Sequence, residues 1–161
     1  MERISVVVVD DHPLFRQGVI DALSLNSELN IVGQAATGEE GLNLIRKLKP
    51  DVAVVDVNLP GINGTQIARH ISQEKIPSRV IFLTAYDDTE QKINAMNLGV
   101  AAYCSKDILP EKLVWVIHQV SQGDFVFDEK IISQGDLELV AEKTAKEIVD
   151  HPLWGREAYQ P

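Results

Sequence analysis

The chain has 161 residues, enough for one domain of common size and a modest extension, and its 45% hydrophobic and 24% charged residues are typical of a soluble globular protein. Its net charge of −9 argues against a broad nucleic-acid-binding surface, because contacts to phosphate groups need clustered lysine and arginine. No apolar run reaches the roughly 18 residues of a membrane span, and the N-terminus lacks a signal-peptide core, so we expect a cytoplasmic protein.

Five short apolar runs predict β-strands, at residues 4–9, 30–35, 52–55, 79–84 and 101–104. The first and third are valine-rich, as in central parallel strands that are covered on both faces. Helix patterns follow each of the five strands. This alternation implies a parallel sheet with right-handed crossovers and helices on both of its faces.

The helix boundaries are indicated by local signals. Pro13 and Pro110 stand at first helical turns, where a missing N–H costs nothing. Capping patterns predict the other three starts: Thr37 with Glu40, Asn63 with Gln66, and Asp88 with Gln91. We expect the first helix to end near residue 25, the second near 48, the third at 73 and the fourth at Gly99. The apolar stripe of the fourth helix is thin, so we expect that helix to be held loosely.

The sequence changes character after Gly123, so we expect a domain over 1–123 and a linker over 124–161. Residues 125–132 resemble a short extended connector. An amphipathic pattern predicts a sixth helix over about 136–149, and 151–161 is expected to be an irregular tail. The stripe of this helix is too narrow to be stable alone, so it must pack on this domain, on a second copy in a homodimer, or on a following domain.

Polar residues follow four of the expected strands and should converge at one edge of the sheet. Asp10 and Asp11 follow the first strand, Asp56 ends the third, Thr84 ends the fourth, and the fifth leads to Lys106. Clustered carboxylates repel one another, and a hard divalent cation such as Mg²⁺ would remove that cost. Lys106 and Thr84 offer a charge and a donor suited to phosphoryl oxygens. Asp56 could therefore accept a phosphoryl group.

Two residue types that often carry chemistry are interpreted as structural. The single cysteine, Cys104, excludes an intrachain disulfide and fits a reducing compartment, and we expect it to be a small buried apolar residue rather than a redox sensor. None of the four histidines has a partner at metal-ligand spacing, and His12 is expected to be structural.

These motifs together resemble a response-regulator receiver domain of two-component signalling, in the NarL/FixJ-like branch. The matching stretches cover about the first 123 residues and are Val9–Gly18, Asp56–Gly64, Leu83–Ala85 and Gly99–Asp107. The resemblance implies a doubly wound (βα)5 flavodoxin-like fold with strand order 2-1-3-4-5. It implies that Asp56 is the phosphoacceptor, that Asp10, Asp11, Asp56 and the Asn58 backbone carbonyl surround Mg²⁺, that Lys106 binds the phosphoryl group, and that Thr84 and Tyr103 form a switch pair.

The resemblance also implies a sensor histidine kinase as partner and transcription as output, with DNA bound only through a helix-turn-helix domain that these residues do not contain. We therefore expect a shortened form of a longer protein, and the alternative is a stand-alone receiver that acts through protein–protein contacts. Many receivers have a proline after the lysine, with a cis peptide bond. This chain has Asp107 there, so we expect a trans bond.

Two other classes fit less well. A phosphatase of the haloacid-dehalogenase type needs a second aspartate two residues after the nucleophile, and Asn58 stands at that position. A flavodoxin-like nucleotide binder needs a phosphate loop rich in small residues after the first strand, and Asp10 and Asp11 would repel phosphate there. The sequence therefore favours a phospho-accepting domain over a turnover enzyme.

Overall fold

The structure is a computed structural model that describes residues 2–132 and 135–136. In this part of the chain, strands and helices alternate up to α5, and two short strands follow. The elements are β1 (Ile4–Val9), α1 (Pro13–Ser24), β2 (Leu29–Ala35), α2 (Gly38–Leu48), β3 (Val52–Asp56), α3 (Gly64–Gln73), β4 (Arg79–Thr84), α4 (Thr89–Asn97), β5 (Ala102–Ser105), α5 (Pro110–Ser121), β6 (Phe125–Phe127) and β7 (Lys130–Ile132).

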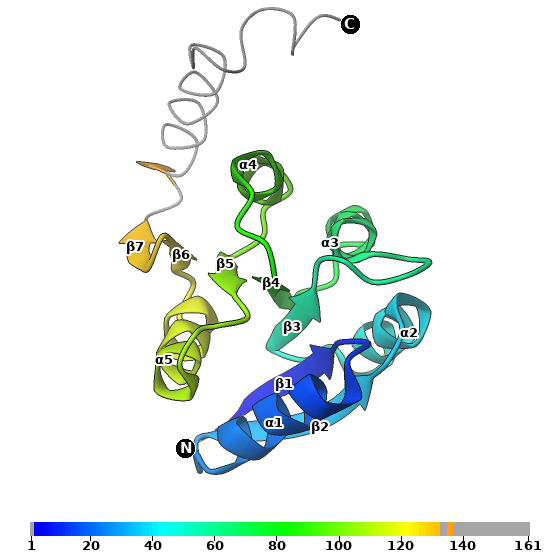
Figure 1. Ribbon diagram of the computed structural model, residues 1–161, viewed down its shortest axis with the longest axis vertical. Coiled ribbons are helices and arrows are strands. Elements are labelled where there is room, and N and C mark those ends of the chain that lie inside the picture. The colour runs from blue at the N-terminus through cyan, green and yellow to red at the C-terminus, as the bar shows by residue number, and fades with distance from the viewer. Residues whose placement is uncertain (1, 133–134, 137–161) are drawn as a thin grey trace, which may run out of the picture.

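All seven strands form one sheet, in the order β2-β1-β3-β4-β5-β6-β7. The pairs from β2 to β6 are parallel, and β7 runs antiparallel to β6. Helices α1 and α5 cover one face of the sheet, and α2, α3 and α4 cover the other (Figure 1). The predicted doubly wound fold and the strand order 2-1-3-4-5 are confirmed. None of the helices described is long and apolar enough to cross a membrane.

The valine-rich strands β1 and β3 lie in the interior of the sheet, with a neighbouring strand on each side, as their sequences predict. Every residue of β3 is buried, as are the last four residues of β1. The local capping signals also predict the helix starts correctly. Asn63 and Gln66 form the complete reciprocal capping box at the start of α3, and the Thr37 side chain accepts a hydrogen bond from the Glu40 N–H at the start of α2.

Helix α4 buries only Ala95 and Met96, which fits the thin apolar stripe of its sequence. That this helix is loosely held stays a prediction. The peptide bond between Lys106 and Asp107 is trans, as expected.

Residues 125–132, expected as an extended connector, are two strands of the sheet itself. All three residues of β6 are buried, and β6 continues the parallel sheet beside β5. The chain returns as β7 through Asp128 and Glu129, whose φ angles of 53° and 61° give the tight hairpin turn. The expected boundary at residue 123 stays a prediction. The predicted sixth helix, over about 136–149, and the predicted tail, over 151–161, lie outside the described residues from 137 onward.

Candidate functional site

Two carboxylates from neighbouring strands meet at the carboxyl edge of the sheet. Val9 and Val55 are paired across β1 and β3, so Asp10 and Asp56, one residue further along each strand, are brought together. Both residues are only 2% exposed. Asp11 lies beside them and is partly exposed. This edge is where open parallel sheets commonly bind ligands.

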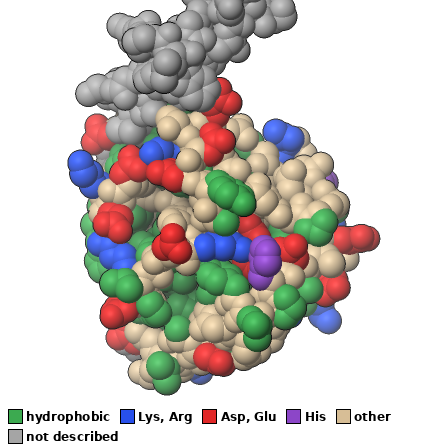
Figure 2. Space-filling view, viewed as in Figure 1, with side chains coloured by type: hydrophobic (Ala, Val, Ile, Leu, Met, Phe, Trp, Pro, Cys, Tyr) green, Lys and Arg blue, Asp and Glu red, His purple; other side chains and the backbone are tan. Residues whose placement is uncertain are grey.

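Lys106 supplies the positive charge at this site. Its Nζ lies 2.8 Å from Asp10 Oδ2 and 3.0 Å from Asp56 Oδ2, and 4.7 Å from the centre of the Phe15 ring. Burial alone would lower the pKa of Lys106, but Asp10 and Asp56 outweigh it and raise the pKa above its ordinary value. The Lys106 side chain therefore stays protonated and positively charged. Figure 2 shows a basic side chain and a histidine meeting acidic side chains near the middle of this face.

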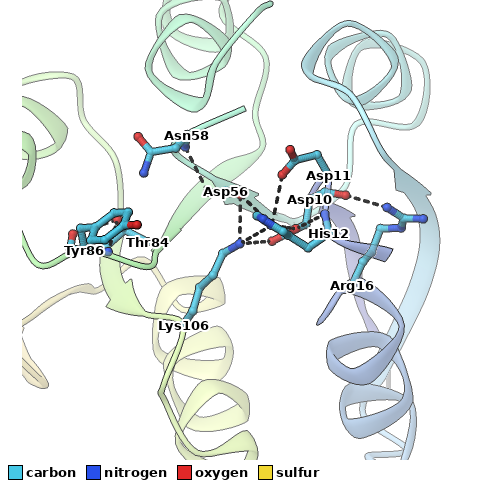
Figure 3. Close-up of polar contacts among 9 residues, drawn as sticks. All are labelled: Asp10, Asp11, His12, Arg16, Asp56, Asn58, Thr84, Tyr86 and Lys106. Carbon is cyan, nitrogen blue, oxygen red and sulfur yellow. Dashed lines mark hydrogen bonds and ion pairs between the residues drawn. The ribbon is translucent and has the colours of Figure 1, made fainter. Parts of the chain in front are cut away.

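Backbone hydrogen bonds hold both buried carboxylates in position (Figure 3). The Asn58 N–H donates to Asp56 Oδ1 at 3.0 Å, and the His12 N–H donates to Asp10 Oδ1 at 2.7 Å. Arg16 Nη1 donates to the backbone carbonyl of Asp10 at 2.7 Å. These contacts leave Asp56 Oδ2 facing Lys106. The carboxylates are therefore oriented before any ligand binds.

The loop after Asp56 is fixed by close packing at Gly64, the first residue of α3. A Cβ atom at Gly64 would lie 2.8 Å from both the Asp56 carbonyl oxygen and Val57 Cα. The Gly64 N–H also donates to the Val57 carbonyl at 3.0 Å. Only glycine allows the helix to begin this close to the acidic residue.

His12 belongs to the same cluster, which sequence reasoning missed. Its Nδ1 lies 3.1 Å from Asp10 Oδ1, 3.2 Å from Asp11 Oδ1 and 3.8 Å from Asp56 Oδ2. Histidine spacing gives no sign that His12 belongs to the cluster, because the partners of His12 are carboxylates. Its position directly after two acidic residues was the available signal.

The acidic residues suit a hard divalent cation. Three carboxylates are opposed by one lysine, whose Nζ contacts Asp10 Oδ2 and Asp56 Oδ2. One oxygen from each of Asp10, Asp11 and Asp56, with a nitrogen of His12, all lie within 4.8 Å of one another. Carboxylate oxygens of this kind are the ligands that Mg²⁺ prefers.

Thr84 ends β4 and Tyr103 lies on β5, and in the part of the chain that the structure describes neither side chain forms a hydrogen bond with the three carboxylates. The Thr84 hydroxyl donates to the Tyr86 carbonyl at 2.9 Å and accepts from the Tyr86 N–H at 3.1 Å, apart from the acidic network in Figure 3. The Tyr103 hydroxyl donates to Gln91 Oε1 of α4 at 2.8 Å. Its burial raises the pKa of Tyr103, so the hydroxyl stays a donor.

Cys104 is buried on β5, as expected, with 8% of its surface exposed. Burial raises the pKa of its thiol to about 12, which disfavours the reactive thiolate. This environment supports the structural interpretation of Cys104.

Comparison with known proteins gives a consistent result. Residues 6–118 match the family model of the response regulator receiver domain. The chain is 38% identical over 122 residues to the probable transcriptional regulatory protein NarL of Mycobacterium tuberculosis, covering 76% of this chain and 56% of that protein. It is 31% identical over 130 residues to the nitrate/nitrite response regulator protein NarL of Escherichia coli, covering 81% of this chain and 60% of that protein.

A solved structure agrees with these matches. The signal receiver domain of NarL from Mycobacterium tuberculosis superposes with a TM-score of 0.75 at 38% identity, over 76% of this chain and 99% of that domain. The chain thus spans somewhat more than half the length of the two regulators, and the superposition covers essentially all of the receiver domain.

Proposed function

Because the chain belongs to the response regulator receiver domain family, a phospho-accepting signalling domain rather than a turnover enzyme, we propose that Asp56 accepts a phosphoryl group from a sensor histidine kinase. One observation carries this assignment. Asp56 is a buried carboxylate at the end of the interior strand β3, with Lys106 Nζ 3.0 Å from its Oδ2. In the cluster, Asp56 is the residue that both the Asn58 backbone and Lys106 orient.

In the proposed transfer, one carboxylate oxygen of Asp56 attacks the phosphorus atom of a phosphohistidine on the kinase. The new O–P bond forms as the P–N bond breaks, and the histidine nitrogen takes the electron pair of that bond and a proton from solvent water. Lys106 offsets the negative charge on the phosphoryl oxygens as they arrive, a role that electrostatic preorganisation favours. The Asn58 N–H keeps the Asp56 side chain in a fixed orientation throughout.

Asp10, Asp11 and Asp56, with the Asn58 backbone carbonyl, would hold Mg²⁺ in this proposal. The bound cation would neutralise charge on the carboxylates and on the phosphoryl oxygens. The gathering of three carboxylates around a single lysine supports this part of the proposal, because a divalent cation would offset the negative charge that Lys106 leaves.

The phosphoacceptor assignment is tested with a small phosphodonor such as acetyl phosphate and Mg²⁺, followed by intact-mass measurement and peptide mapping. We expect one base-labile phosphoryl group, located on Asp56. Asp56→Asn should abolish it, whereas the control Asp107→Asn, which changes an exposed carboxylate beside Lys106, should retain it. A phosphoryl group on another residue, or an unchanged yield in Asp56→Asn, would refute the assignment.

Thr84 and Tyr103 are proposed to report phosphorylation to α4. The Thr84 hydroxyl is held by Tyr86, and Tyr103 is held by Gln91, so the two side chains bracket the segment that leads from β4 into α4. A phosphoryl group on Asp56 would compete for the Thr84 hydroxyl. The loss of the Thr84–Tyr86 contacts would then free that segment to move, and α4 has a small buried face to resist the motion.

For the output, we propose transcriptional control through a DNA-binding domain that is not among these residues. The names of two relatives, both longer than the matched region, support this proposal. The alternative is a receiver that acts alone through protein–protein contacts. Sequencing the complete reading frame distinguishes them, because a helix-turn-helix segment after residue 161 is expected only under the first.

A further inference from the structure

A cavity of about 290 Å³ lies between α3 and the turn that follows α4. Both helices cover the same face of the sheet (Figure 1), and the cavity lies at the amino ends of β4 and β5, the edge opposite to Asp56. Six apolar residues line it: Ala68, Ile71, Ile76, Val80, Leu98 and Val100. The carboxylates of the acidic cluster do not line it, so the cavity is separate from the proposed phosphorylation site.

One buried hydroxyl beside this cavity has no hydrogen-bond partner. Ser78, in the loop before β4, has 6% of its surface exposed, and its Oγ forms no hydrogen bond with any residue that the structure describes. A buried polar group without a partner is unfavourable, and such groups are rare in proteins. Ser78 lines the cavity, and rotation about its χ1 angle can turn the hydroxyl toward that space. The hydroxyl is therefore available to a ligand held there.

Lys75 adds a positive charge to the lining of the same cavity. It is exposed, it has a φ angle of 56° in the turn after α3, and its ammonium forms no ion pair or hydrogen bond with the described part of the chain. The neighbouring Glu74 does not neutralise this charge, because Glu74 pairs with Arg46 at 2.7 Å. A free ammonium on a flexible stem can meet an anionic group at the mouth of the cavity.

We propose that this cavity binds a small aromatic carboxylate that carries a hydroxyl group on its ring, of which 4-hydroxybenzoate is an example. The ring packs among the apolar residues, the carboxylate accepts from Lys75, and the ring hydroxyl bonds to the Ser78 hydroxyl. The volume of about 290 Å³ is at the lower end of the ~300–1,000 Å³ that is typical of ligand pockets, so the ligand is a single-ring molecule. An apolar lining with a few polar groups that fix the orientation of the ligand is the usual composition of such sites.

The test compares three probes by chemical-shift titration of the 161-residue chain. The probes are 4-hydroxybenzoate, benzoate, which lacks the hydroxyl, and 4-hydroxybenzyl alcohol, which lacks the charge. We expect benzoate to bind about threefold more weakly than 4-hydroxybenzoate, because one neutral hydrogen bond is lost. The alcohol should bind about fivefold more weakly, because an exposed ion pair is lost. The amides that shift should lie within 75–80 and 98–100.

Two variants assign each preference to its residue. In Ser78→Ala, 4-hydroxybenzoate and benzoate should bind equally well, and in Lys75→Gln, 4-hydroxybenzoate and the alcohol should bind equally well, because protein and probe then lack the same contact. Lys49→Gln is a matched control. Lys49 is exposed and has a φ angle of 45° after α2, but it does not line the cavity. This variant should bind all three probes as the wild type does.

Preferences that persist in Ser78→Ala and Lys75→Gln, or a wild type that binds none of the probes, would overturn the inference. Asp56→Asn should bind 4-hydroxybenzoate as the wild type does, because the cavity and the acidic cluster lie at opposite edges of the sheet. Loss of binding in Asp56→Asn would place the probe in the acidic cluster and would equally overturn the inference. The result is therefore independent of whether Asp56 accepts a phosphoryl group.

Discussion

Two lysines in this protein make a direct test of how the acidic site is stabilised. Lys106 and Lys92 each have 12% of their side chain exposed, and each pairs with a carboxylate at 2.8 Å. The two ion pairs differ in the burial of the carboxylate partner. The Asp10 side chain beside Lys106 is 3% exposed, whereas the Asp128 side chain beside Lys92 is 66% exposed. The two substitutions to methionine keep most of the unbranched apolar stem of the side chain and remove its ammonium group.

We expect Lys106→Met to destabilise the fold much more than Lys92→Met in the presence of EDTA. Without Lys106, Asp10 and Asp56 are buried charges that have lost their cation, and removing one partner of a buried pair costs about 3–5 kcal/mol. Asp128 is hydrated whether or not Lys92 is present, so losing that pair should cost at most about 1 kcal/mol. For a chain of this size the larger loss lowers the thermal unfolding midpoint by about 6–20 °C.

The assay is urea unfolding of the wild type and both variants, with EDTA and then with saturating Mg²⁺. Mg²⁺ at about 100 times its dissociation constant adds ~2.7 kcal/mol to the free energy of unfolding. We expect a larger gain in Lys106→Met, because the cation supplies the missing positive charge. Losses in EDTA that agree within about 0.5 kcal/mol between the two variants would refute the reasoning, since both ion pairs would then contribute alike.

Three further predictions concern packing, the thiol and the switch region. Gly38→Ala should destabilise the fold by more than about 3 kcal/mol in thermal unfolding, since its Cβ would lie 1.7 Å from a backbone oxygen of the loop after β3. The control Gly18→Ala, with nothing within 4 Å of the added Cβ, should stabilise the fold by about 0.5–1 kcal/mol. Equal shifts of the two variants would contradict this. Cys104, with a pKa of about 12 against an ordinary 9.0, should resist alkylation in the folded protein at pH 8, and rapid labelling would contradict its burial. The free energy of unfolding should fall as pH rises from about 9 to 12, because in that range only the unfolded chain loses the thiol proton. Tyr103→Phe should lose about 1 kcal/mol of stability and speed amide hydrogen exchange in α4, since the part-buried hydrogen bond from the hydroxyl to Gln91 Oε1 is removed. Unchanged exchange would mean that this hydroxyl does not hold α4.

Much of the fold and of the site was predictable because it depends on local chain properties. The capping box of Asn63 and Gln66 works within one helical turn, so it fixes the start of α3 without reference to the rest of the protein. The apolar runs that precede Asp10 and Asp56 identify central strands, and parallel strands bring their carboxyl ends to one edge. The convergence of these two acids therefore followed from sequence alone.

Other features were decided only by tertiary structure. The three residues of β6 are too few to show a period, and they form a strand because the exposed edge of β5 pairs with them. The place of His12 in the cluster depends on its rotamer and on carboxylates from two strands. Whether the Thr84 hydroxyl binds Tyr86 or faces Asp56 is likewise a side-chain rotation. Sequence patterns position the backbone, but hydroxyl and imidazole groups are oriented by neighbours distant in sequence, which only the folded chain brings together.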